Sequence, residues 1–363
     1  MSLENLVIVK THDLPIRHVG NVHNGKVRSV YWLNAKDSKK VRELFGTIAP
    51  NPLGVMIISD RISAFECIWQ SKGMAGVPKK GASLNAISQY WFKRFEEEGL
   101  AGNHILATPH PLAWIVQRAK PIMIEAIARE YIDGSMWREY EKGAREFCDI
   151  ELPDGLKRGQ KLDKLMLTPT TKGTLRNIPG IPEKDDVNIT RQQIVGNYRA
   201  FGFNSVKDVS HLEMLLAKGF YLISGELDDA GELFGDTKFE FGYILNLNGK
   251  WVMVYIDEVG TPDSSREYDK KQHAKGILKE NSKEPFRNVL LNGVPDRDVL
   301  LNKKRMPERI ELAKNYRVSD EDMMEVSRLY EGLAEKITKK PLPKIGNARE
   351  EIIDSLAQYG IIE

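Results

Sequence analysis

Residues 236–258 form the segment DTKFEFGYILNLNGKWVMVYIDE, which carries more information about the fold than any other stretch of the chain. Two runs of alternating apolar and polar residues flank Asn248-Gly249. Asn-Gly between such runs predicts a β-hairpin with a two-residue type I′ turn. With that turn, the register places Glu240 directly across from Asp257.

The predicted register gives the hairpin one apolar face and one charged face. The apolar face holds Phe239, Phe241, Tyr243 and Leu245 with Val252, Val254 and Ile256, and the charged face holds Lys238, Glu240 and Gly242 with Tyr255 and Asp257. Two carboxylates about 5 Å apart repel each other unless a cation compensates them. The pair therefore predicts a Mg²⁺ site shared with nucleotide phosphates, or else two solvated acids on an exposed face.

Composition bounds the class of protein. The 363 residues are enough for two ordinary domains, and 41% hydrophobic with 29% charged residues is a globular composition. A net charge of +2 excludes the strong basic excess of a dedicated nucleic-acid binder. The two cysteines, Cys67 and Cys148, cannot build a disulfide framework. We find neither a signal peptide nor a membrane span, and expect a soluble, cytoplasmic protein with no nucleic-acid or membrane partner.

Strands and helices are mixed without strict alternation, which predicts an α+β fold with antiparallel sheets. Strands are expected at 27–33, 53–59 and within 115–131, and helices at 83–98, 190–199, 205–218, after Ser319 and from Asn347 to Gly360. Residues 152–186 are polar and proline-containing, which predicts a functional loop, such as a lid, or a linker.

Several short segments could bind anions. The turn Asn24-Gly25 followed by Lys26 and Arg28 could place backbone amides and two cations around a phosphate, although it lacks the spacing of a Walker loop and could equally be an ordinary turn. Residues 129–135 and 261–266 each pair an arginine with hydroxyl groups, which suits a phosphate monoester or a set of ion pairs and caps. No Ser-His-Asp order or G-x-S-x-G motif indicates a hydrolase.

In sequence order, these pieces resemble the phosphoribosylaminoimidazole-succinocarboxamide synthase (SAICAR synthetase) family. The motifs that carry the resemblance are Gly25 to Arg28, Ser59 to Phe65, Val77 to Gly81 with Trp91-Phe92, Arg129 to Ser135 with Trp137 and Glu139-Tyr140, Thr168 to Lys172, Asp236 to Gly242, and Asp257-Glu258 with Pro262 to Arg266. The resemblance covers about residues 20 to 270 and fades beyond Lys270.

The resemblance implies an ATP-dependent ligase of purine biosynthesis. ATP would phosphorylate the carboxylate of carboxyaminoimidazole ribonucleotide, and L-aspartate would attack the acyl phosphate. Site residues are implied in four groups. Gly25, Lys26, Arg28 and Glu240 would bind the nucleotide; Glu240 and Asp257 would hold Mg²⁺; Arg129, Ser135, Lys238, Ser265 and Arg266 would hold the ribonucleotide phosphate; and Ser59, Asp60, Arg61 and Ser63 would form a substrate-side loop. Lys238 and Asp263 are the implied catalytic residues, with Asp263 beside the imidazole.

An ATP-grasp-like two-domain cleft is implied as well. Residues 1–120 would form a smaller ATP-covering domain, 121–270 a larger substrate- and metal-binding domain, and 271–363 a helical extension that packs on the core or forms a contact between copies in a homo-oligomer. Two features depart from the family pattern: Glu66 replaces the usual Asp, and the glycines in 231–235 predict a bent strand. A small-molecule kinase using the same cleft, and a non-catalytic nucleotide-binding relative, are the alternative functions.

Overall fold

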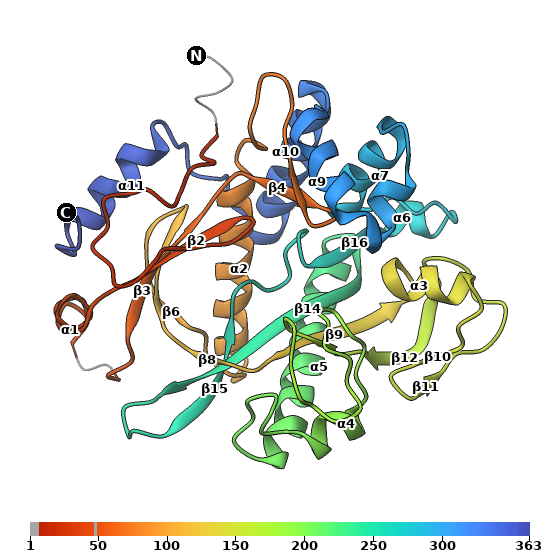
Figure 1. The fold of residues 1–363 in the computed structure, drawn as a ribbon, viewed down its shortest axis with the longest axis horizontal. Coiled ribbons are helices and arrows are strands. Elements are labelled where there is room, and N and C mark those ends of the chain that lie inside the picture. Colours follow the sequence, from red (N-terminus) through yellow and green to blue (C-terminus); the bar gives the residue numbers. More distant parts are fainter. Residues whose placement is uncertain (1–6, 47–48) are drawn as a thin grey trace.

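The computed structural model describes residues 7–46 and 49–363, and its core is built on two antiparallel sheets (Figure 1). The first sheet has the order β1-β2-β3-β7-β6, with strands His23–Asn24, Arg28–Trp32, Leu53–Ile58, Ala113–Gln117 and Ile105–His110. The second has the path β12-β9-β14-β15, with strands Lys161–Leu167, Ile124–Tyr131, Glu232–Leu245 and Trp251–Ile256. β8 (Lys120–Pro121), β13 (Thr170–Thr171) and β16 (Ser265–Asp269) pair at its sides. The predicted α+β class is confirmed.

Two long helices pack between and beneath these sheets. α2 (Lys80–Glu97) buries Leu84, Ile87, Trp91 and Phe95 at the predicted helical spacing. α5 (Val206–Asp229) packs against β14 and β9 and runs eleven residues beyond the predicted end at Lys218. Gly219 does not end this helix. A Cβ there would lie 3.1 Å from Phe239 and 3.2 Å from Phe95, so the glycine allows close packing of helix on sheet.

The shorter elements of the first 270 residues lie at the edges of this core. They are α1 (Ala35–Glu43), β4 (Ile62–Ala64), β5 (Cys67–Trp69), α3 (Gly134–Glu141), β10 (Glu146–Phe147), β11 (Ile150–Glu151) and α4 (Arg191–Gly196). The predicted turn at Asn24-Gly25 is confirmed, because the Gly25 amide donates to the Arg28 carbonyl at 2.8 Å between β1 and β2. The predicted loop 152–186 is wrong in part, since residues 161–167 form β12 along the edge of β9.

The β14–β15 hairpin exists, but its predicted register is wrong by one residue. Leu245 pairs with Trp251, so Glu240 faces Ile256 instead of Asp257. The cause is Asn246, whose side-chain oxygen accepts the amides of Asn248 and Lys250 at 3.0 and 2.9 Å and so closes a longer loop than a two-residue turn. A shift of one residue in the pairing moves every side chain of one strand to the opposite face relative to its partner strand.

The strand that precedes the hairpin is bent, as the glycines in 231–235 predicted. β14 pairs Phe234 with Glu267 and then Asp236 with Arg266, so one residue of β14 is left over at Gly235. An extra residue in one strand is a β-bulge, which bends the strand and redirects the side chains that follow. The bulge therefore sets the direction in which Asp236 and Lys238 leave the sheet.

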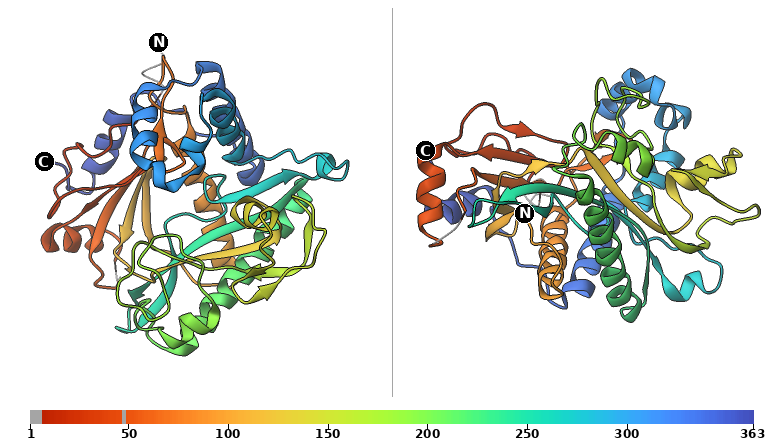
Figure 2. Two further views of the ribbon diagram at one scale, coloured as in Figure 1. Left: turned by 45° about the vertical axis from the view of Figure 1, so that its right-hand side comes forward. Right: turned by 90° about the horizontal axis from the view of Figure 1, so that it is seen from below.

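Residues beyond 270 are mostly helical and lie beside elements of the first 120 residues and β16 (Figure 2). The helices are α6 (Lys270–His273), α7 (Glu284–Gly293), α8 (Asp298–Leu301), α9 (Met306–Asn315), α10 (Asp320–Thr338) and α11 (Ala348–Ala357). The predicted caps Ser319 and Asn347 accept the amides of Asp322 and Glu350. α10 packs along α2, α11 on β6 and α9 on β5.

We predict that the extension contributes to global stability. Leu290 of α7 is fully buried in the core that contains β2 and β3. Leu290→Ala should therefore lower the free energy of unfolding by about 2–5 kcal/mol, measured by urea denaturation. Leu301→Ala removes the same atoms from an exposed side chain of the same region and should change it by less than about 0.5 kcal/mol. Equal effects of the two substitutions would contradict this packing.

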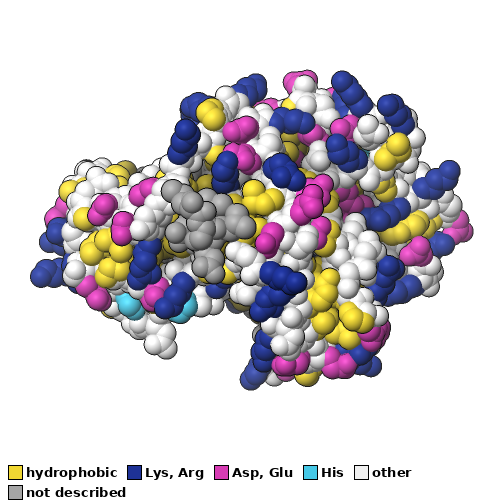
Figure 3. Space-filling model, turned by 90° about the horizontal axis from the view of Figure 1, so that it is seen from above, with side chains coloured by type: hydrophobic (Ala, Val, Ile, Leu, Met, Phe, Trp, Pro, Cys, Tyr) yellow, Lys and Arg dark blue, Asp and Glu magenta, His cyan; other side chains and the backbone are white. Residues whose placement is uncertain are grey.

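Basic and acidic side chains are interspersed on the face seen from above (Figure 3). Among the helices of the described residues, none combines the length and the apolar character needed to cross a bilayer.

Candidate active site

A cavity of about 990 Å³ lies where α3, the second sheet and the C-terminal extension meet, and we call it the main cavity. Four of the predicted site residues line it: Arg129, Ser135, Lys238 and Arg266. Arg138, Arg158, Arg287 and Lys303 also line it and were not predicted. Arg138 follows the predicted Ser135 by one turn of α3, so helical spacing could have identified it; the others come from segments without a motif.

Two arginines converge on one buried carboxylate at one end of this cavity. Asp236 Oδ2 accepts hydrogen bonds from Arg129 Nη1 and, at 2.6 Å, from Arg266 Nη1. Burial opposes the charge on Arg266, but Asp236 and Glu284 raise its pKa above the usual value. Ser135 Oγ lies 3.4 Å from Arg129 Nη2. Glu284 also lies 3.9 Å from Arg266, but Arg138 and Arg287 line the same cavity, so four guanidinium groups meet two carboxylates there. The excess positive charge suits an anion.

The residue at position 134, beside these arginines, must be glycine. Gly134 has φ +60°, and a Cβ there would lie 2.4 Å from Arg266 Nη2. A side chain at this position would therefore be strained and would displace the guanidinium. The Asp-Gly-Ser sequence at 133–135 consequently makes room for Arg266 while it begins α3 and presents the Ser135 hydroxyl to the cavity.

A second charged cluster on β14 borders the same cavity, which Lys238 and Glu125 line. Lys238 Nζ donates to Glu240 Oε1 at 2.8 Å and to Glu125 Oε1 at 2.9 Å, and Lys172 Nζ contacts Glu240 Oε2. Burial alone would lower the pKa of Lys238, but Glu240 and Glu125 raise it. Lys172 belongs to the Thr168–Lys172 motif, yet it was not predicted as a site residue. The cluster holds Glu240, almost fully buried, between two ammonium groups.

Asp257 approaches this cluster from the end of β15 although it does not oppose Glu240. It has φ +63°, outside the strand, and its carboxylate contacts Arg28 Nη1. Burial by itself would raise the pKa of Asp257. The nearby cations, including Arg28 and Lys238, outweigh burial and hold the pKa below its usual value. Arg28 also donates to Glu258 Oε2 at 2.9 Å. Arg28 thus joins the first sheet to the hairpin. Its guanidinium group, which was predicted to face ATP, is paired with Asp257 and Glu258 instead.

Two predicted residues lie away from the main cavity. The side chain of Asp263 is only 4% exposed and accepts hydrogen bonds from Lys80 and Lys283 at 2.9 Å and from the Tyr330 hydroxyl at 2.6 Å. Burial raises its pKa, but Lys283 and Lys80 outweigh that and keep it charged. Ser265 is also buried and pairs with the Thr237 hydroxyl at 2.8 Å. Both side chains support the loop that carries Arg266, and neither lines the cavity.

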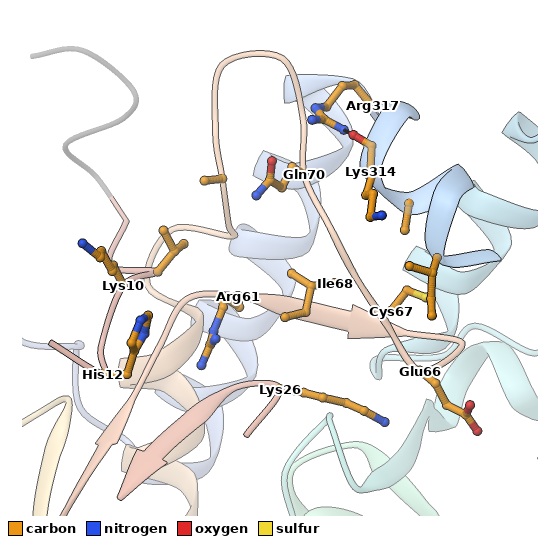
Figure 4. A pocket seen from close by; sticks show the side chains of 14 residues that line it. Lys10, His12, Lys26, Arg61, Glu66, Cys67, Ile68, Gln70, Lys314 and Arg317 are labelled. Atoms are coloured by element: carbon orange, nitrogen blue, oxygen red, sulfur yellow. Dashed lines mark hydrogen bonds between the residues drawn. The ribbon is translucent and has the colours of Figure 1, made fainter. Parts of the chain in front are cut away.

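The residues of the predicted nucleotide and substrate loops meet in a second cavity of about 690 Å³, which we call the N-terminal cavity (Figure 4). Lys26 and Arg61 line it. Gly25 and Ser59 lie beneath, because Arg61 donates to the Gly25 carbonyl at 3.1 Å and to Ser59 Oγ at 2.9 Å. The structure does not place Ser63 in the lining of either cavity.

Asp60 of the same loop is a structural anchor. It is buried and accepts the amides of Ile8 and Gly81, both at 2.9 Å. Burial raises the pKa of Asp60 to about 6 despite these two hydrogen bonds. Its carboxylate ties the N-terminal segment to the start of α2, so it does not face a ligand.

A family model described as SAICAR synthetase matches residues 37–298. Proteins named phosphoribosylaminoimidazole-succinocarboxamide synthase from Vibrio parahaemolyticus and Vibrio cholerae are each 55% identical over 367 residues, covering 100% of both chains. The chain belongs to the SAICAR synthetase family. Its members are ligases of purine biosynthesis that use ATP to join L-aspartate to carboxyaminoimidazole ribonucleotide.

Solved structures of SAICAR synthetases share the fold. The chain described as SAICAR-synthase from Saccharomyces cerevisiae complexed SAICAR has a TM-score of 0.65 at 22% identity, covering 93% of this chain and 99% of that one. A type-2 SAICAR synthetase in complex with ADP has a TM-score of 0.57 at 19% identity, covering 90% of this chain and 100% of that one.

The likeness to SAICAR synthetases reaches further than the motifs indicated. The family model extends to residue 298, beyond Lys270, and the Vibrio relatives match the whole chain including the helical extension. The Gly25–Arg28 turn lies before the start of the match to the family model.

Proposed function

We propose that the main cavity binds the ribonucleotide and that ATP with Mg²⁺ binds beside it, at the cluster of Lys238, Glu240 and Asp257. The observation that carries this assignment is that the cavity with the anion site is also lined by Lys238, whose ammonium group is hydrogen-bonded to the buried carboxylate of Glu240. A reaction that transfers a phosphoryl group from ATP to the carboxylate of a ribonucleotide needs these two sites side by side.

The ribonucleotide phosphate fits the end of the cavity where Arg129 and Arg266 converge. Their guanidinium groups and the Ser135 hydroxyl provide the donors that a phosphate monoester accepts. In this arrangement Asp236 fixes both arginines before the ligand arrives, so little side-chain entropy is lost on binding. Ser265 and Asp263 act behind them by holding residues 261–266 in place.

The carboxylates fit Mg²⁺ by their chemistry. Among residues 7–46 and 49–363 no three His, Cys, Asp or Glu side chains are grouped as a metal site. Mg²⁺ needs fewer protein ligands, because it is commonly held by one or two carboxylates together with substrate phosphates and water. Glu240 and Asp257 would be those two carboxylates. The bound ion would neutralise charge on the transferred phosphoryl group.

The protein's own groups then have distinct tasks. The γ-phosphoryl group leaves ADP and forms a bond to a carboxylate oxygen of the ribonucleotide. The aspartate amine gives up a proton to water and attacks the acyl carbon, the bond from that carbon to the phosphate oxygen breaks, and inorganic phosphate leaves. Lys238 and Lys172 would stabilise the negative charge on the oxygens around this carbon. Lys26, in the neighbouring N-terminal cavity, would contact the nucleotide phosphates.

The domain division follows the same assignment. Residues 1–120 would cover ATP, and 121–270 would carry the ribonucleotide and metal sites. Residues 271–363 would complete the main cavity, because Arg287, Leu301 and Lys303 line it.

An ADP-release assay with each substrate omitted in turn tests this function. We expect release to require the ribonucleotide, ATP and Mg²⁺, and product to form only with L-aspartate. Steady ADP release with the ribonucleotide alone, accompanied by a stable phosphorylated product, would favour the kinase alternative, which the comparisons do not favour.

A further inference from the structure

The segment 257–266 carries a residue of a proposed ligand site at each end. It begins with Asp257, one of the two carboxylates proposed for Mg²⁺, and ends with Arg266, one of the two arginines proposed for the ribonucleotide phosphate. Between them the backbone packs tightly on α2. Gly260 has φ +59°, and a Cβ there would lie 2.6 Å from the ring of Trp91. A displacement of this segment would therefore move groups of both sites.

Asp263 ties the middle of this segment to three other parts of the chain. Its Oδ2 accepts hydrogen bonds at 2.9 Å from Lys80, at the start of α2, and from Lys283, directly before α7. Its Oδ1 accepts the hydroxyl of Tyr330 of α10 at 2.6 Å. The Lys283 amide also donates to the Pro262 carbonyl at 3.0 Å. Two of the three donors to this carboxylate thus belong to the C-terminal extension.

These contacts indicate that Asp263 acts on the position of its segment. Its side chain is only 4% exposed, both of its oxygens are hydrogen-bonded to the protein, and it lines neither cavity. Removing one partner of a buried, hydrogen-bonded charge is strongly destabilising, because the remaining charge is left without compensation. Each of the three donors therefore helps to keep this segment in one arrangement.

Tyr330 reaches this carboxylate from a firm support. α10 packs along α2 (Figure 1), and Ser327 Oγ donates to the Pro78 carbonyl at 2.7 Å. Tyr330 is fully buried, and the Lys80 ammonium group lies 5.6 Å from the centre of its ring. Burial and the charge of Asp263 raise the pKa of Tyr330 well above its usual value. The hydroxyl group therefore keeps its proton near neutral pH and can donate it.

We propose that Tyr330 is a positioning residue for both ligand sites. By fixing Asp263, its hydroxyl group holds the segment 257–266 so that Arg266 meets the ribonucleotide phosphate and Asp257 meets Mg²⁺. A displacement of about 1 Å caused by a change far from the reacting atoms can lower a rate by about 10²-fold. This role of the extension is additional to the side chains that it contributes to the main cavity. The inference rests on the proposed function.

Tyr330→Phe tests the inference, because it removes only the hydroxyl group. We expect the KM for the ribonucleotide and the half-saturating Mg²⁺ concentration each to rise about tenfold, the effect of losing one hydrogen bond to a charged group. The KM for L-aspartate should change by less than about twofold, since neither end of the segment is proposed to bind it. Lys283→Met removes the other side chain of the extension that contacts Asp263 and should raise the same two values.

Tyr243→Phe is the matched control. Tyr243 is buried, and its hydroxyl group donates to Asp208 at 2.6 Å, outside both cavities. The substitution removes an equally short hydrogen bond to a carboxylate. It should lower the free energy of unfolding about as much as Tyr330→Phe does, and it should leave all three kinetic values within about twofold.

Three results would overturn the positioning role. They are unchanged ribonucleotide and Mg²⁺ values in a Tyr330→Phe protein that is folded by circular dichroism, an equal rise in all three values, and the same selective rise in Tyr243→Phe. Failure of the proposed function would look different, because ADP release by the wild type would then not depend on the ribonucleotide.

Discussion

Replacing Glu240 with Gln should lower kcat by about 10²- to 10³-fold, the range found when one preorganised electrostatic group is removed from an active site. Glu240 is the carboxylate that two lysines contact, and it is one of the two proposed Mg²⁺ ligands. The amide keeps the size and one acceptor oxygen but loses the charge. Steady-state ADP release at several Mg²⁺ concentrations measures the effect, and half-saturation should move to higher Mg²⁺.

Glu130→Gln is the matched control for this substitution. Glu130 lies on β9, pairs with Lys161 and does not line the main cavity. This substitution should change kcat by less than about twofold, because Glu130 only forms an ion pair with the exposed Lys161. The Glu240 variant should remain folded by circular dichroism, because Lys238 retains Glu125 as a partner. A folded Glu240 variant with unchanged kcat would remove the metal assignment.

Arg266→Met should raise the KM for the ribonucleotide at least about thirtyfold, because removing one partner of a buried hydrogen-bonded charge pair usually costs about 2–5 kcal/mol. The KM for ATP should stay nearly constant, since Arg266 lies at the other charged end of the cavity. Initial rates with each substrate varied in turn provide the measurement. Arg266→Lys should give an intermediate value, because it keeps the charge but loses the planar fork.

Arg191→Met serves as the control for the arginine series. Arg191 is an exposed residue of α4 that pairs with Glu213, outside both cavities. If Arg266→Met raised the KM for ATP as much as the KM for the ribonucleotide, the substitution would act through the fold, and the phosphate-binding role of Arg266 would be contradicted.

The hairpin at 236–258 shows how far local patterns determine geometry. Its alternation correctly predicted two paired strands, but its two acids have different partners: Glu240 contacts Lys238 and Lys172, and Asp257 contacts Arg28. The register depended on Asn246, whose side-chain oxygen competes with the backbone for two amides. Such competition depends on residues outside the two turn positions, so the motif Asn-Gly could not reveal it.

The anion site was predictable because its residues lie in compact motifs. Arg129 and Ser135 are separated by a strand end and one helix start, and Arg266 pairs across the sheet from Asp236. Asp263 and Asp60 carried the same kind of signal, yet both are anchors inside the protein. What distinguishes them is which cations and amides surround them, and Lys80, Lys283 and Tyr330 come from three separate helices or their ends.

By itself, the amino-acid sequence determined the α+β class, the helix caps at Ser319 and Asn347, the bend at Gly235 and three charged groups that line the main cavity, Arg129, Lys238 and Arg266. These depend on contacts between neighbours along the chain. Only the tertiary structure decided that Arg28 pairs with Asp257 and Glu258 and that the extension supplies Arg287 and Lys303 to the main cavity. It also decided that Arg61 is buried with no carboxylate of residues 7–46 and 49–363 within ion-pair distance. The physical reason is that charge compensation and burial depend on groups hundreds of residues apart, which only the packing of sheets and helices brings together.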